Sequence, residues 1–223
     1  MAVIVEDPFT VASDTNLQDH TPSTTGDQWV QEFNDSTAKN FVVEEATDDL
    51  DVGNEASVAI IVTSRPNPTV VEYDIEMNIK SSNYGADTRP FILIARFTDT
   101  SNMYGLGNYR SPVAADAKIW KLVSGTPTEL ASGDTGWANG VVIKAKITDA
   151  TKKLFKDAAE ILSSSDNALT SAGRAGIGGG DVFVSGDGLP SSGQWDDYKV
   201  TETSAAGLSI PVAMHNYRRR RVA

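Results

Sequence analysis

The chain has 223 residues, a net charge of −11 and no cysteine, which excludes disulfide scaffolds, cysteine-ligated zinc sites and thiol nucleophiles. Its two histidines, His20 and His215, leave little for a histidine-rich metal site or a serine–histidine triad. The acidic balance disfavours nucleic acid as a partner, because binding to phosphates needs basic faces, and no stretch approaches the roughly 18 apolar residues of a membrane span.

The N-terminal segment MAVIVEDPF starts with a short apolar run that stops at Val5 and is followed by Glu6 and Asp7. A secretory signal needs a basic start and an apolar run of about 7–15 residues. We therefore expect synthesis in a cytoplasm without export through a signal peptide. The residues Ala2–Val5 are themselves a candidate strand.

Short apolar or alternating runs, separated by turn residues, predict an all-β protein with two packed sheets. The expected strands are Gln28–Phe33, Phe41–Val43, Ser57–Val62, Val70–Ile79, Pro90–Phe97, Met103–Tyr109, Lys118–Val123, Thr128–Ala131, Val141–Thr148, Arg174–Ile177 and Asp197–Thr203. Val70–Ile79 has the clearest alternation, with apolar side chains on one face and Glu72, Asp74 and Glu76 on the other.

Two segments leave alternatives open. Glu44–Glu55 holds six carboxylates in twelve residues, and it is either a solvated loop or a calcium loop, since hard cations take several oxygen ligands. Lys152–Leu162 has helical propensity, with Leu154, Phe155 and Leu162 near one helical face, but its context favours a β-hairpin.

Several ordered segments together resemble the concanavalin A-like lectin/glucanase superfamily, in particular its laminin-G-like jelly rolls. The segments that carry the resemblance are DPFTVASDTNLQDHTP, VEYDIEMNI, FILIARFTDTSNMYGL, KIWKLVSGTPTEL, the block VVIKAKITDATKKLFKDAAEILSSSDNALTSAGRAGIG, and WDDYKVTE. The resemblance implies a two-sheet antiparallel β-sandwich with a jelly-roll topology over residues 7–203. It also implies that Lys152–Leu162 is a hairpin. Function is not fixed by this fold, which carries lectins, hydrolases and structural proteins.

The sequence Glu72-Tyr73-Asp74-Ile75-Glu76 resembles the carboxylate signature of laminarinase-type glycosidases with this jelly roll. In those enzymes the first and last carboxylates are the nucleophile and the acid/base. A retaining pair needs carboxyl groups about 5–5.5 Å apart, whereas residues i and i+4 on a strand start roughly 13 Å apart. We therefore predict that these carboxylates form a solvated strand face and that the protein is not an enzyme.

Aromatic side chains could form a platform for a sugar ring, because carbohydrate CH groups stack on aromatic faces. The candidates are Tyr84, Tyr104, Tyr109, Trp120 and Trp137. Trp137, in the loop-like segment Gly136–Gly140, is the best single candidate. The alternative is that these aromatics are core residues or cross-strand contacts.

The resemblance also implies a structural calcium near the closing strand. The matching positions here are Asp196 and Asp197, and Asp7 near the first strand could add oxygen ligands. A capped or solvated turn is the alternative at these positions.

The C-terminal segment IPVAMHNYRRRRVA differs from the rest of the chain, with Tyr217 followed by Arg218, Arg219, Arg220 and Arg221. Adjacent like charges repel unless anions meet them, so the segment is either a solvated arm or a tail that docks on an acidic face. It resembles the short C-terminal segments that end some structural proteins of tailed phages. We expect a jelly-roll domain over residues 1–206 and a docking tail over 207–223.

These observations lead to a primary hypothesis of a non-enzymatic virion structural protein, a capsid decoration or cement protein or a head-fibre component. It would be made in the host cytoplasm, form a homo-oligomer and dock on a capsid or other virion protein. The alternative is a carbohydrate-binding adhesin of a phage tail or surface fibre with a glycan partner. A laminarinase-like glycosidase is a third hypothesis.

Overall fold

The computed structural model describes residues 1–13, 15–20, 28–34, 41–44, 49–52, 60–64, 67–82, 91–110, 115–134, 136–179 and 193–203. Within these ranges the secondary structure is β-strand apart from one short 3-10 turn, η1 (Leu17–Asp19). No helix in these ranges is long and apolar enough to cross a membrane. The tail residues Tyr217, Arg218, Arg219, Arg220 and Arg221 lie outside the described residues, so the docking prediction stays a prediction.

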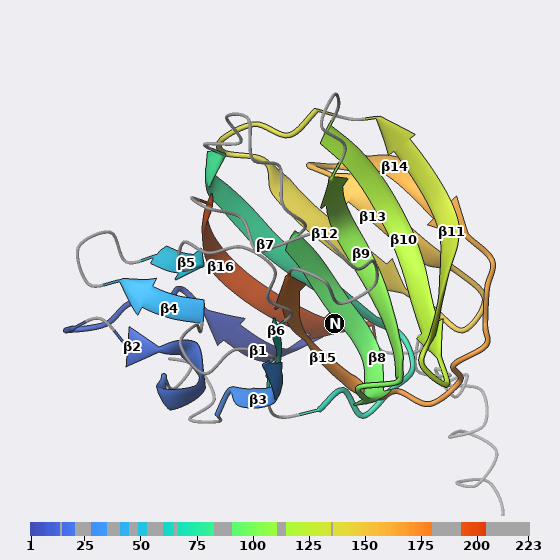
Figure 1. Ribbon diagram of the computed structural model, residues 1–223, viewed down its shortest axis with the longest axis horizontal. Coiled ribbons are helices and arrows are strands. Elements are labelled where there is room, and N and C mark those ends of the chain that lie inside the picture. Colours follow the sequence, from blue (N-terminus) through green and yellow to red (C-terminus); the bar gives the residue numbers. More distant parts are fainter. Residues whose placement is uncertain are drawn as a thin grey trace, which may run out of the picture.

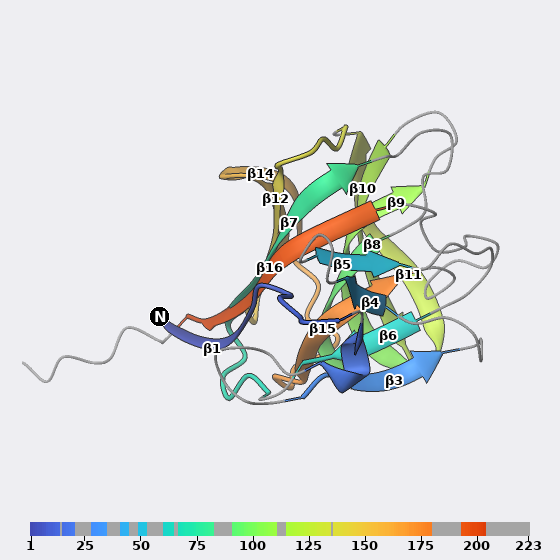
Figure 2. The ribbon, with the colours of Figure 1, turned by 90° about the vertical axis from the view of Figure 1, so that its left-hand side faces the viewer.

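The described strands form two antiparallel sheets packed face to face (Figures 1 and 2). Sheet A runs in the order β14 (Ala159–Ser164), β13 (Lys152–Lys156), β12 (Val142–Ile147), β7 (Tyr73–Ser82), β16 (Gly193–Glu202), β5 (Asp49–Val52), β4 (Phe41–Glu44) and β2 (Thr15–Asn16), with β1 (Ala2–Asp7) also paired to β16. Sheet B runs in the order β11 (Thr126–Asp134), β10 (Ala115–Val123), β9 (Asn102–Arg110), β8 (Phe91–Asp99), β15 (Arg174–Gly179), β6 (Ile60–Thr63) and β3 (Val30–Asn34). The expected two-sheet antiparallel β-sandwich is confirmed.

The core lies between the sheets and is built from the alternation of each strand. In β7, Tyr73, Ile75, Met77 and Ile79 point inward and are at most 2% exposed. Trp195 of β16 stacks on Phe91 of β8 at 4.1 Å between ring centroids, so the two sheets meet through aromatic rings. Burying side chains of this size stabilises the sandwich by about 1.5–3 kcal/mol each.

The described parts of both ambiguous segments are strands. Lys152–Leu162 forms the hairpin β13–β14, in which Leu154 pairs with Leu162, as the family resemblance implies and against the local helical propensity. In the acidic segment Glu44–Glu55, residues Asp49–Val52 form β5, so the expectation of a loop there is wrong. Leu50 is fully buried, and this inward side chain holds the acidic strand in the sheet.

Candidate functional site

The outer face of sheet B carries a second apolar cluster, separate from the core between the sheets. Its six side chains are each at most 7% exposed: Ile61, Ile92, Ile94, Phe97, Met103 and Leu122. An outer sheet face normally meets solvent and is polar. Sheet B is therefore apolar on both faces, and its outer face is the surface that differs from an ordinary sandwich.

Glycines flank the apolar residues of β8 on this outer face. In the paired register, Ile94 lies between Gly105 of β9 and Gly176 of β15, and Ile92 lies between Gly107 and Gly178. A Cβ at Gly107 would lie 2.3 Å from the Phe91 carbonyl oxygen, so the backbone approach there excludes any side chain. The strands on either side of β8 thus leave two strips without side chains.

Trp120 of β10 lies at the rim of this face. It is half-buried, packs against the outer cluster and pairs with Gly105 across the β9–β10 ladder. Lys118 Nζ lies 5.8 Å from the centroid of the Trp120 ring. Gly105 is itself buried, so the exposed part of the indole is the surface that a flat ligand ring can contact.

A charged pair stands next to Trp120. Lys118 Nζ lies 3.1 Å from Glu129 Oε2, and a register shift between β10 and β11 places Glu129 directly opposite Trp120. A hydrogen bond from Ser132, together with Lys118, lowers the pKa of Glu129. The carboxylate is therefore ionised at neutral pH, so donor and acceptor groups lie side by side at the ring.

A second charged pair lies at the other side of the same face. Arg174 of β15 contacts Glu32 of β3, and the Thr63 hydroxyl donates to Glu32 Oε1 at 2.9 Å. The Arg174 guanidinium also lies 4.8 Å from the Phe97 ring centroid. Both of these cations have a carboxylate partner, so the two pairs add no net charge to the face.

The sequence-predicted aromatic residues are distributed between the core and the outer face. Trp137 is 8% exposed and packs in the core, so its ring does not provide an open platform. Tyr104 is fully buried, and its hydroxyl donates to Asp166 Oδ1 at 2.6 Å. Burial, followed by that contact, raises the pKa of Tyr104 to about 12. The side chains of Tyr84 and Tyr109 are outside the described residues, which leaves Trp120 as the described candidate on the surface.

The three carboxylates proposed for calcium are held in different contacts. Asp7 is fully buried and accepts hydrogen bonds from Phe9 N at 2.9 Å and Trp29 Nε1 at 2.7 Å, with His20 Nε2 at 2.8 Å. Asp196 pairs with Lys80 at 3.0 Å, and Asn78 donates to Asp197 at 2.6 Å. Burial, followed by the neighbouring Asp196, raises the pKa of Asp197. No group of three or more acidic or histidine side chains able to hold a metal occurs in the described ranges, and calcium binding stays a prediction.

The acidic signature on β7 faces outward from sheet A. Lys144 Nζ lies 2.8 Å from both Asp74 Oδ2 and Glu76 Oε1, while Glu72 precedes the strand. Burial would lower the pKa of Lys144, but hydrogen bonds to Asp74 and Glu76 raise it overall. Two of the three carboxylates thus share one ammonium group as a partner.

Comparison with known structures matches this sandwich along most of the chain. The carbohydrate-binding module CBM66 of Bacillus subtilis is 13% identical with a TM-score of 0.54, covering 78% of this chain and 95% of that module. A Bacillus subtilis protein of unknown function with a galectin-like fold is 10% identical with a TM-score of 0.59, covering 91% and 96%. The fold is that of the concanavalin A-like, galectin-like β-sandwiches. No family model and no curated protein matches the chain.

Two further neighbours show how this sandwich occurs in other proteins. The exoplasmic domain of VIP36, in a form bound to Ca²⁺ and Man3GlcNAc, is 10% identical with a TM-score of 0.57, covering 78% of this chain and 84% of that one. The Bacteroides ovatus xyloglucan-locus protein GH43B is 14% identical with a TM-score of 0.57. The match covers 91% of this chain but only 40% of that larger protein. The fold therefore occurs both alone and as part of longer chains.

The sequence contains signals for the outer face besides its aromatic residues. FILIA is a continuous apolar run, which is typical of a strand covered on both faces. The neighbouring segment NMYGLGNYR places Gly105 and Gly107 on alternate positions. Together these patterns predict an apolar outer face beside bare backbone. They do not predict that Lys118 and Glu129 lie beside Trp120, because that depends on the strand register.

Proposed function

We propose that the protein is a non-catalytic carbohydrate-binding module and that its ligand contacts the outer face of sheet B at Trp120. The observation that carries this proposal is the half-buried Trp120 ring beside Gly105, with the Lys118–Glu129 pair at 3.1 Å next to it. Protein sites for sugars combine an apolar ring with a few directional polar groups, because a pyranose presents CH and hydroxyl groups together. The carbohydrate-binding neighbours support the same class of function.

The charge of this face favours a neutral saccharide. Both Lys118 and Arg174 are paired with carboxylates, so neither cation is left to attract an anion. Hydroxyl groups, which both donate and accept, match a paired ammonium and carboxylate better than a charged ligand does.

A role without catalysis is supported by the contact of Glu76, the last carboxylate of the signature, with Lys144 at 2.8 Å. A glycosidase of this type needs one carboxylic acid kept protonated and one free nucleophile. Glu76 meets neither condition, because it accepts from an ammonium group. Incubation of the protein with laminarin and lichenan should release no reducing sugar, and release that is lost in Glu72→Gln and Glu76→Gln would replace this proposal with a glycosidase.

The first test of binding is a panel of neutral β-glucan, fructan, xylan and mannan oligosaccharides, titrated by calorimetry. We expect at least one to bind, and Trp120→Ala to weaken it by at least tenfold, since loss of one stacked ring removes most of the apolar contact. Lys80→Ala, on sheet A and 45% exposed at its side chain, is the matched control and should bind normally. Equal binding by the Trp120→Ala and parent proteins would reject the site.

A further inference from the structure

The outer face of sheet A carries charges of both signs. Its described carboxylates include Glu6 on β1, Asp74 and Glu76 on β7, and Glu160 on β14. The lysines Lys144, Lys146 and Lys153 lie on the adjoining strands β12 and β13. Lys144 is at the boundary, where it contacts both Asp74 and Glu76. Strands β12 and β13 therefore carry a strip of lysines between the carboxylates of β7 and Glu160 of β14.

Two of these lysines face each other without a carboxylate between them. Lys146 and Lys153 are direct cross-strand partners in the β12–β13 ladder. Lys153 Nζ pairs with Glu160 Oε2 at 2.7 Å on its other side. Lys146 lies opposite Asp74 in the β7–β12 ladder but makes no ion pair with a described residue. Like charges directly opposite each other destabilise a sheet. An anion bound beside Lys146 would remove that repulsion.

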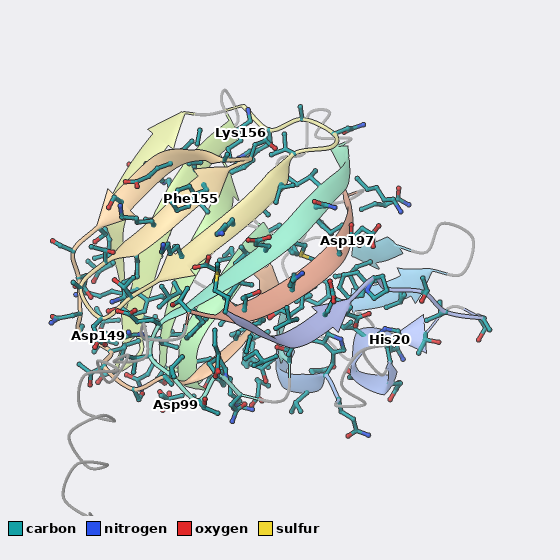
Figure 3. All side chains as sticks on the ribbon, turned by 180° about the vertical axis from the view of Figure 1, so that it is seen from behind. His20, Asp99, Asp149, Phe155, Lys156 and Asp197 are labelled. Atoms are coloured by element: carbon teal, nitrogen blue, oxygen red, sulfur yellow. The ribbon has the colours of Figure 1, made fainter. Side chains whose placement is uncertain are left out.

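An aromatic ring lies next to this lysine pair. Phe155 of β13 alternates with the buried Leu154, so it points to the outer face, where it is partly exposed (Figure 3). It is the direct cross-strand partner of Lys144 and lies two residues from Lys153 on the same face. Direct cross-strand partners have Cβ atoms about 4.5–5.5 Å apart and diagonal neighbours about 7–8 Å apart. Lys146 is the diagonal neighbour of Phe155.

We propose that the strip formed by Phe155, Lys144, Lys146 and Lys153 binds an acidic saccharide, with a sugar ring against Phe155 and its carboxylate at Lys146 and Lys153. A uronic acid carries an apolar CH face and a carboxylate on one sugar ring. This matches a face on which Phe155 lies two residues from Lys153 and diagonal to Lys146. The strip lies on the opposite sheet from Trp120, so it is a second site with a different ligand charge.

An acidic saccharide fits this strip better than a protein surface does. Lys144 and Lys153 keep their own carboxylate partners, so only one unpaired charge within the strip, at Lys146, is offered to a ligand. A single aromatic ring with one unpaired ammonium group matches one charged sugar residue. A stable protein interface buries about 800 Å² on each partner and favours an apolar centre, which this charged face does not provide.

The test uses an α-1,4-linked tetragalacturonate as ligand and its methyl ester as the uncharged control, titrated by calorimetry and by NMR. We expect the acid to bind more tightly than the ester. Its affinity should fall by at least threefold between 50 and 300 mM salt, because exposed charge contacts are screened. Phe155→Ala and Lys146→Glu should each lower the affinity for the acid by at least tenfold. Thermal melts of both variants should match the parent, because both side chains point away from the core.

Two control variants keep this site distinct from the other face. Trp120→Ala should leave tetragalacturonate binding unchanged, and Lys199→Ala, on the same outer face but paired with Glu6 at 3.2 Å, should change it by less than twofold. No binding by the parent protein at millimolar ligand, or undiminished binding by Phe155→Ala and Lys146→Glu, would overturn the proposal. A concentration-dependent dimer that disappears in Phe155→Ala would also overturn it, since the strip would then meet a second copy.

Discussion

Lys152 is a fully buried cation that is held by backbone oxygens. Its ammonium donates to the carbonyl oxygens of Thr148 at 3.1 Å, Asp149 at 3.3 Å and Asp166 at 2.8 Å, and it lies 4.9 Å from the Tyr104 ring centroid. Burial, followed by repulsion from Arg96, lowers the pKa of Lys152 to about 8. The amine therefore joins two loops at one end of the sandwich at a cost in desolvation.

This lowered pKa predicts a stability change in mild alkali. The unfolded chain keeps its lysine protonated up to a pKa of about 10.4, so between about pH 8 and 9.5 it binds more protons than the folded chain. The contribution of Lys152 to the free energy of unfolding therefore rises with pH across that window. We expect a Tm gain of ~2–4 °C. The tyrosines with raised pKa, Tyr104 among them, oppose this only above about pH 10. Lys152→Met should lack the gain in melts by circular dichroism, and equal slopes in both proteins would contradict the assignment.

The β14–β15 connection depends on a close approach between Gly173 and the β8 backbone. Arg96 has a φ of 49° and donates from its guanidinium to the carbonyl oxygens of Leu169, Val71 and Thr148. Gly173 has a φ of 60°, and a Cβ there would lie 2.4 Å from the Arg96 carbonyl carbon. The connection can therefore reach the buried guanidinium only with glycine at this position.

Gly173→Ala should destabilise the protein by ~3 kcal/mol or more, since it adds a backbone clash to the cost of a positive φ. Gly140→Ala is the matched control, because Gly140 has a φ of 79° and an added Cβ would meet nothing within 4 Å. Its substitution should cost only ~1–2 kcal/mol. Urea denaturation of both variants measures the difference, and equal losses would show that the approach to Arg96 relaxes.

At the scale of single elements, the sequence predicts strands better than it predicts their partners. The alternation in β7 is explicit in the sequence, and its inward residues are buried as expected. The loop-like surroundings of Trp137 make it a candidate for a sugar platform, with core packing as the alternative. In the structure Lys156 Nζ donates to the Gly136 carbonyl at 2.5 Å and the indole packs inward, as in the alternative. Such long-range contacts depend on which strands are neighbours, and alternation within one strand carries no information about that. For the same reason, the sequence does not predict that Lys118 meets Glu129 or that Lys146 lies opposite Lys153.

At the scale of the whole molecule, the two sheets are used differently. The outer faces of both sheets carry ion pairs, such as Lys144–Glu76 on sheet A and Lys118–Glu129 on sheet B. Among the described residues, a buried outward apolar cluster lies on sheet B. The virion role predicted from the arginine-rich tail depends on residues outside the described ranges and stays a prediction, whereas the proposed binding faces lie within them.

The two sheets are also joined at the N-terminus by one buried carboxylate. Asp7 at the end of β1 in sheet A accepts from the Trp29 indole, which directly precedes β3 in sheet B, and contacts His20. Asp7→Ala would leave those buried donors unpaired and should cost ~3 kcal/mol, a fall in Tm of ~6–12 °C. Glu6→Ala removes the neighbouring carboxylate, whose pair with Lys199 at 3.2 Å is partly exposed, and should cost under ~1 kcal/mol. Calorimetric melts compare the two variants, and a Tm for Asp7→Ala within about 2 °C of that for Glu6→Ala would show that the sheets are held together without this carboxylate.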